Sequence, residues 1–170
     1  TGNAHNVQLI KTRTMYSNII QIGTEVIGKE DFINALTLYE GGYGFFDYCS
    51  EVLEAYRKIV IEDFCSCILP EGMFTPIDEN SLRYNGGIGK WTEEWVARIH
   101  GKAVKVSSEN VFKFVGEAYW LKREIENPLD TNIRFFIDGE PMLSAGFMSW
   151  VSGLEEGTVL FFGGVIRYHF

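Results

Sequence analysis

This chain of 170 residues has few of the residues from which metal and redox centres are built. It has three histidines and three cysteines, and an odd cysteine count without regular spacing is not a disulfide framework. Cys65 and Cys67 form a C-x-C pair whose side chains point about 200° apart on a helix, whereas zinc sites usually use wider pairs with further ligands. We therefore expect reduced thiols, no metal and no other cofactor, in an intracellular protein.

The chain also lacks long apolar runs and an excess of positive charge. No apolar run approaches the roughly 18 residues that a membrane-spanning helix needs, so we expect a soluble protein. Fifteen Lys and Arg against 23 Asp and Glu give a formal net charge of −8. Because acidic surfaces repel phosphate, this charge disfavours direct binding to nucleic acid and favours a basic protein partner.

Motifs of the familiar catalytic classes are missing: the sequence has no G-x-S-x-G, no H-E-x-x-H and no Walker A loop. If the protein is an enzyme, two residues are the first candidates for acid–base chemistry. Glu117 lies in an apolar stretch predicted as a strand, and His169 lies near the end of another. For both, the alternative is a solvent-facing residue without a catalytic role. We favour a protein that is not an enzyme.

Aromatic residues, by contrast, are abundant: thirteen Phe, eight Tyr and four Trp make up 15% of the chain. They crowd the glycine-rich stretch 41–48, which is too apolar for a solvated loop. Tyr and Trp are favoured at interfaces, so an aromatic surface patch or an aromatic-lined cavity competes with simple packing in the core. The candidates for contact with a partner are Tyr43, Phe45, Phe46, Tyr48, Tyr84 and Trp91.

Helical periodicity predicts three helices before residue 102. The best covers residues 50–68, where Ser50 is a good N-cap and an apolar stripe that includes Tyr56 and Val60 recurs at helical spacing. Shorter helices are predicted at 28–40 and 90–101, each followed or closed by glycine. We expect the helix 50–68 to lie across a sheet and to bury its stripe.

Strand-like patterns prevail after residue 102. Residues 111–123, 132–137 and 142–151 are predicted as strands. The chain ends in two β-branched and aromatic runs separated by Gly163-Gly164, a pair suited to a two-residue hairpin turn. The sequence thus predicts one α+β domain, residues 1–170, with helices packed on one face of a mostly antiparallel, curved sheet that ends in this hairpin.

This order, helices first and a long curved antiparallel sheet afterwards, resembles the cone-shaped NTF2-like families in topology, without a shared motif. Two functions follow as hypotheses. The first is a non-enzymatic module for protein binding or assembly, structural in nature, which self-associates as a homo-oligomer or binds a partner protein. The alternative is a small-molecule binding protein or enzyme with an aromatic-lined pocket between sheet and helices. An open cavity would favour the second function, and a flat apolar patch the first.

Overall fold

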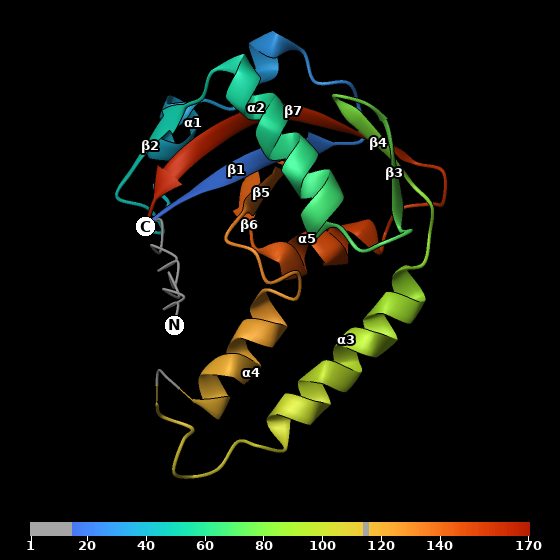
Figure 1. The fold of residues 1–170 in the computed structure, drawn as a ribbon. Helices are drawn as coiled ribbons and strands as arrows, with labels where there is room; N and C mark the ends of the chain where they lie inside the picture. The colour runs from blue at the N-terminus through green and yellow to red at the C-terminus, as the bar shows by residue number, and fades with distance from the viewer. Residues whose placement is uncertain (1–14, 114–115) are drawn as a thin grey trace, which may run out of the picture.

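The computed structural model describes residues 15–113 and 116–170, and the fold is α+β, built around one open sheet (Figure 1). Seven described strands are joined in the order β3-β4-β7-β1-β5-β6, and β2 pairs with the far half of β7. All of these pairs are antiparallel except β1 with β5. The predicted fold class is therefore confirmed. The strands are β1 (Tyr16–Gly23), β2 (Tyr48–Glu51), β3 (Phe74–Asp78), β4 (Ser81–Tyr84), β5 (Arg134–Ile137), β6 (Glu140–Met142) and β7 (Val159–His169).

Helices lie on both faces of the sheet, so the prediction that they pack on one face is wrong, and two of them extend beyond it. Figure 1 shows α2 crossing in front of β7 and β1, with α5 below it, while α3 and α4 project away from the sheet as a pair. The helices of the described residues are α1 (Ala35–Glu40), α2 (Glu54–Asp63), α3 (Ile88–Ala103), α4 (Glu117–Glu126) and α5 (Ser144–Val151), with a 3-10 turn η1 (Lys29–Asp31) and a π-helical turn η2 (Phe64–Ile68).

The long strand β7 replaces the hairpin predicted at the C-terminus. Its eleven residues run without a break through Gly163 and Gly164, so the predicted turn is wrong. The register against β1 shifts between Ile20 and Ile22, which leaves the two glycines opposite Gln21 alone as a β-bulge. A Cβ on Gly164 would lie 2.7 Å from the carbonyl oxygen of Ile33. Glycine is needed here for close backbone approach within a strand, and not for a turn.

The main core lies between one face of the sheet and the helices α2 and α5. Alternating strand residues such as Ile20 and Phe135 point into it and meet Phe64 of η2 and Phe147 of α5. The rings of Phe135 and Phe147 stack with their centroids 4.4 Å apart. A smaller core on the opposite face packs Leu38 of α1 against strand residues of the other parity. The sheet is thus buried from both sides over its central strands.

The helix predicted over residues 50–68 is shorter and turned differently about its axis. Ser50 pairs with Arg167 inside β2, and the helix begins only after Leu53. Val60 is buried as predicted, but Tyr56 is 37% exposed. Arg57, expected on the solvated face, is only 4% exposed. Arg57 hydrogen-bonds to the backbone of the sheet, so its side of α2 faces inward. Hydrophobic periodicity does not detect a buried charged residue of this kind.

The second half of the chain is more helical than predicted. The strand predicted at 132–137 is confirmed as β5, and Asp138-Gly139 turns the chain into β6. The strands predicted at 111–123 and 142–151 are wrong, because α4 and α5 occupy these regions within the described residues. The order of elements expected for an NTF2-like cone, helices first and sheet afterwards, is therefore also wrong.

The projecting pair α3 and α4 is held by polar contacts more than by a core. None of the residues of α3 is buried, and Trp95 donates its indole N–H to the carbonyl of Glu124 across 2.8 Å. The Glu124 carboxylate lies 2.8 Å from Arg98 Nε and 3.1 Å from Lys102 Nζ. The predicted helix at 90–101 is confirmed as part of α3, although Val96, expected to be buried, is exposed.

Candidate binding pocket beside α4

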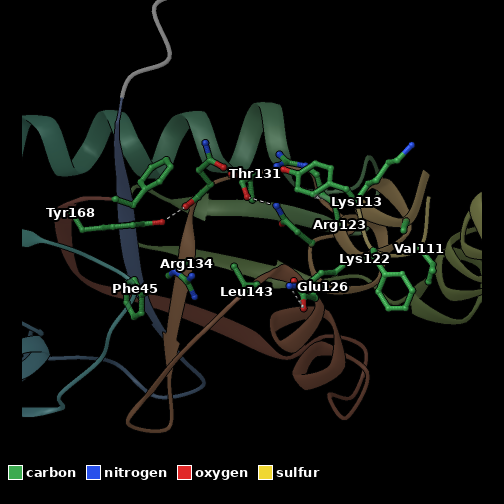
Figure 2. Close-up of a pocket in the computed structure, with 16 residues that line it drawn as sticks. Phe45, Val111, Lys113, Lys122, Arg123, Glu126, Thr131, Arg134, Leu143 and Tyr168 are labelled. Carbon is green, nitrogen blue, oxygen red and sulfur yellow. Dashed lines mark hydrogen bonds and ion pairs between the residues drawn. The ribbon is translucent and has the colours of Figure 1, made fainter. Parts of the chain in front are cut away.

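A cavity of about 460 Å³ opens beside α4, on the sheet face opposite α2. Figure 2 shows side chains from β5, β7, α4 and the loops around them lining it. The lining residues come from the glycine-rich loop after α1, residues 111–113, α4 and the loop after it, β5, Leu143 and the end of β7. Its volume falls within the range of about 300–1,000 Å³ that is typical of ligand sites.

The inner end of the cavity is formed by Tyr168, Arg134 and Phe45. Strand alternation puts Tyr168 of β7 and Arg134 of β5 on the same face. The Tyr168 hydroxyl donates to the carbonyl of Asn132 across 2.6 Å, and the ring is 4% exposed. Burial raises the pKa of Tyr168, although the charge of Arg134 opposes the shift. The phenol is therefore neutral and its proton is committed to the protein backbone.

Arg134 is the unusual residue of this end. Its guanidinium lies over the ring of Phe45, 4.0 Å from the ring centroid, a cation–π contact. Its Nε atom is buried and has no hydrogen-bond acceptor among the described residues. None of the ion pairs between described residues includes Arg134. The guanidinium is half-buried between the Phe45 ring and the hydroxyl of Tyr168, which is close enough for Arg134 to lower the pKa of Tyr168.

The remaining charges of the cavity wall lie toward its mouth and are largely paired. Arg123 lies 2.8 Å from Asp130, and that carboxylate raises the pKa of Arg123. Lys122 lies 3.8 Å from Glu126. Counting the described lining residues, the wall has four cations, including Lys113, and one carboxylate, Glu126. The cavity is therefore locally basic in a chain whose net charge is −8.

The rest of the wall is apolar apart from Asn127, Thr131 and Asn132, and the side chains of Asn127 and Thr131 already hydrogen-bond within the protein. Ala118 and Tyr119 of α4, Phe112 and Leu143, which precedes α5, line the cavity, and Val111 lies at the end opposite Tyr168 in Figure 2. An apolar wall with a single cation at one end suits a molecule that is itself apolar along most of its length.

The predicted partner-contact residues fall into three groups. Phe45 lines the cavity, and the rings of Tyr43 and Phe46 pack against the ring of Phe45. Tyr48 is exposed at the surface. Tyr84 is buried in the main core at 2% exposure, and Trp91 lies half-buried on α3 against Trp95.

The two candidate catalytic residues are not brought together in the cavity. Glu117 is the first residue of α4 and does not lie in a strand, so the prediction of its setting is wrong. His169 alternates with Tyr168 on β7 and therefore faces the other side of the sheet, where its Nδ1 lies 3.1 Å from Asp47 Oδ2 and its ring stacks on Tyr48. Neither Glu117 nor His169 lines the cavity.

Arg134 is the residue that sequence reasoning missed. The signal was present: a single arginine stands among Ile133, Phe135, Phe136 and Ile137. On a strand buried on both faces, any charged residue calls for a partner.

Comparison with known proteins adds no assignment: the scan of family models and the searches of curated proteins and of solved structures each found no match to this chain. Within residues 15–113 and 116–170, none of the helices is long and apolar enough to cross a membrane. The same residues contain no group of three or more His, Cys, Asp or Glu side chains arranged to hold a metal ion.

Proposed function

We propose that this protein is a small-molecule binding protein whose ligand occupies the cavity beside α4. The observation that carries the proposal is the half-open, aromatic-lined cavity of about 460 Å³ itself. Eight of its sixteen lining residues are apolar or aromatic, and its volume is typical of sites that bind small molecules. Of the two functions expected from the sequence, the cavity supports the second, a small-molecule binding protein or enzyme with an aromatic-lined pocket.

The cavity wall supports binding more than catalysis. Its titratable side chains are four cations, two of them paired with carboxylates, together with Glu126, Tyr119 and Tyr168, whose hydroxyl already donates to Asn132. No described lining residue is a histidine or a cysteine, and Glu126 is the single lining carboxylate. General acid–base chemistry needs a group that can exchange a proton with the ligand, and the inner end of the cavity offers none with an ordinary pKa near neutrality.

A neutral apolar fluorophore, N-phenyl-1-naphthylamine, tests this proposal. We expect one molecule per chain to bind with a rise in fluorescence, and the variant Ala118→Phe to weaken binding at least about tenfold by filling the cavity. Ala97→Phe is the matched control, because Ala97 lies on the exposed side of α3. Absence of binding to the wild-type chain, or equal binding to both variants, would contradict the proposal.

A second function, self-association, is favoured by a tyrosine patch at the end of the sheet. Tyr16, Tyr48 and Tyr56 are each at least 37% exposed and surround Arg167 and His169. Tyr and Arg are the residue types that dominate the energetics of interfaces. We propose that a second copy of the chain docks there.

Sedimentation equilibrium at low and high salt tests self-association. We expect a dimer that is lost in a Tyr48→Ser and Tyr56→Ser double variant, whereas Tyr43→Ala with Phe46→Ala leaves it intact because those rings pack around Phe45. A chain that is monomeric at all concentrations, or that binds only a basic protein in a salt-sensitive way, would exclude the dimer.

A further inference from the structure

We propose that the ligand of the cavity beside α4 is a monoanionic organic acid, whose carboxylate binds Arg134 and whose apolar body extends toward Tyr119 and Val111. This inference rests on the proposed binding function and adds the chemical class of the ligand and the residue that recognises it.

The first argument is the unmatched charge of Arg134. The chain has eight more acidic than basic residues, yet no described carboxylate lies within ion-pair distance of this guanidinium. Removing a charge from water is costly unless the charge is paired. By contrast Arg57, the fully buried arginine of α2, has a hydrogen-bond acceptor on each of its three nitrogens. A bound anion would give Arg134 the counterion that the described residues do not supply.

The second argument is the geometry around the guanidinium. The ring of Phe45 covers one face of the guanidinium plane, with its centroid 4.0 Å from the guanidinium carbon. This contact restrains the orientation of the guanidinium. The buried Nε has no acceptor in the described part of the chain. Because Nε has almost no accessible surface, a carboxylate in the cavity reaches the terminal nitrogens, and it accepts two parallel hydrogen bonds when it approaches them in the guanidinium plane.

The third argument concerns the charge of the ligand. The neighbouring cations Arg123 and Lys122 already have Asp130 and Glu126 as partners, and Lys113 lies at the opposite, outer end of the cavity in Figure 2. The inner end therefore offers one uncompensated positive charge. A phosphate monoester, which carries close to two negative charges at neutral pH, would be left with charge unpaired beside the buried ring of Tyr168. One guanidinium matches one carboxylate.

The body of the ligand is defined by the apolar wall. Besides Arg134, the cavity is lined by Leu143, Ala118, Tyr119 and Val111, and in Figure 2 Leu143 lies near Arg134 and Val111 toward the opposite end. These side chains offer contact area and no hydrogen bonds except through the Tyr119 hydroxyl. A ring system or a short acyl chain attached to the carboxylate meets this wall. A sugar or a nucleoside, with several hydroxyl groups, would lose hydrogen bonds to water on entry.

Isothermal titration calorimetry with three probes of one ring system tests the assignment: 1-naphthaleneacetate, its neutral amide, and 1-naphthyl phosphate. We expect the acetate to bind at least about tenfold more tightly than the amide and the phosphate, since a hydrogen-bonded charge pair contributes about 1.5–3 kcal/mol. Arg134→Gln should weaken the acetate about 10- to 100-fold and leave the amide unchanged. Arg134→Lys keeps the charge without the fork and should give an intermediate affinity.

Arg167→Gln is the matched control, because Arg167 is an exposed arginine on β7 that faces the other side of the sheet. It should leave the affinity for all three probes unchanged. Equal binding of acetate and amide to the wild-type chain would overturn the carboxylate assignment, but it would leave the proposed binding function of the pocket intact. Tighter binding of the phosphate would also overturn it, in favour of a phosphoryl ligand. If none of the probes binds, and N-phenyl-1-naphthylamine does not bind either, the proposed function itself fails. If Arg134→Gln does not fold, the comparison of the three probes on the wild-type chain still tests whether the cavity prefers a carboxylate.

Discussion

The Nε atom of Arg57 donates a hydrogen bond to the carbonyl oxygen of Gly163 across 2.7 Å, so α2 is fixed to the bulge in β7. The same guanidinium donates to the carbonyl of Phe162 at 3.0 Å and to the side chain of Asn80 at 2.8 Å. A β-bulge leaves backbone groups without partners in the ladder, and here a buried arginine satisfies two of them. The bulge, α2 and the turn after β3 therefore depend on one side chain.

Arg57→Met is expected to destabilise the protein by about 3 kcal/mol, because the carbonyls of Phe162 and Gly163 would stay buried without donors. Chemical denaturation followed by circular dichroism measures this loss. Lys58→Met is the control, since the ion pair of Lys58 with Glu79 is at the surface and should be worth less than about 1 kcal/mol. Equal effects of the two variants would show that Arg57 does not have this function.

Gly164→Ala is expected to be costly for a different reason. Its Cβ would lie 2.7 Å from a backbone oxygen of Ile33, and backbone cannot move aside as a side chain can. Overpacking of this kind costs about 1–3 kcal/mol, and a lowered melting temperature would measure it. Gly101→Ala, in α3 and with no atom within 4 Å of the added carbon, should instead raise stability by about 0.5–1 kcal/mol. A neutral Gly164→Ala would contradict the close approach.

These glycines illustrate what the sequence could and could not predict. The pair Gly163-Gly164 was correctly singled out as a place where only glycine fits, but local sequence does not distinguish a turn from a bulge. That choice depends on Gln21, more than 140 residues earlier in the chain, whose side-chain oxygen accepts the N–H of Gly164 at 2.8 Å. Long-range contacts of this kind are absent from any window of sequence.

The helix α4 also depends on long-range contacts that local sequence does not show. Its aromatic residues, Tyr119 and Trp120, favour a strand by local propensity. Glu124 of this helix meets Arg98 and Lys102 of α3, and these contacts link segments more than 20 residues apart. Since α4 forms one wall of the cavity, the error in the predicted strand 111–123 also concealed the candidate site. The class of fold, β5 and its turn, and the helix at 90–101 were predictable because local periodicity and packing agree there.

The rotation of α2 about its axis is tested by two aspartate substitutions. Val60 is 5% exposed, so Val60→Asp would bury an unpaired charge and cost more than about 4 kcal/mol. Tyr56, although part of the same predicted stripe, is exposed, and Tyr56→Asp should cost about 1 kcal/mol or less. Thermal denaturation of both variants gives the comparison. Two equally severe effects would support the stripe predicted from sequence over the observed helix orientation.

The three cysteines should differ in reactivity. Burial raises the pKa of Cys65 to about 11 and also raises that of Cys49, whereas Cys67 is exposed. Because the thiolate is the reacting form, iodoacetamide at pH 8 should label Cys67 first in the native protein. Mass spectrometry of the labelled peptides reads the order, and labelling in denaturant without reductant should reach all three thiols. Early labelling of Cys65, or a thiol that stays blocked in denaturant, would contradict this.

Acid should loosen the projecting pair α3 and α4 before the sheet unfolds. Burial by itself would raise the pKa of Glu124, but hydrogen bonds and charge from Arg98 and Lys102 outweigh it, and the pKa is lowered below its ordinary value. A carboxyl whose pKa is lower in the folded state stabilises the fold fully above its unfolded pKa of about 4.3, and this contribution is lost as the pH falls through the folded pKa. Protonated Glu124 leaves Arg98 and Lys102 without this counterion. The indole N–H of Trp95, which donates to the Glu124 backbone, reports the contact as an NMR signal assigned with Trp95→Phe. We expect this signal to shift below about pH 4, while Glu124→Gln shows the loosened position at neutral pH and no further acid shift. An acid transition that persists unchanged in Glu124→Gln would mean that another group controls the pair.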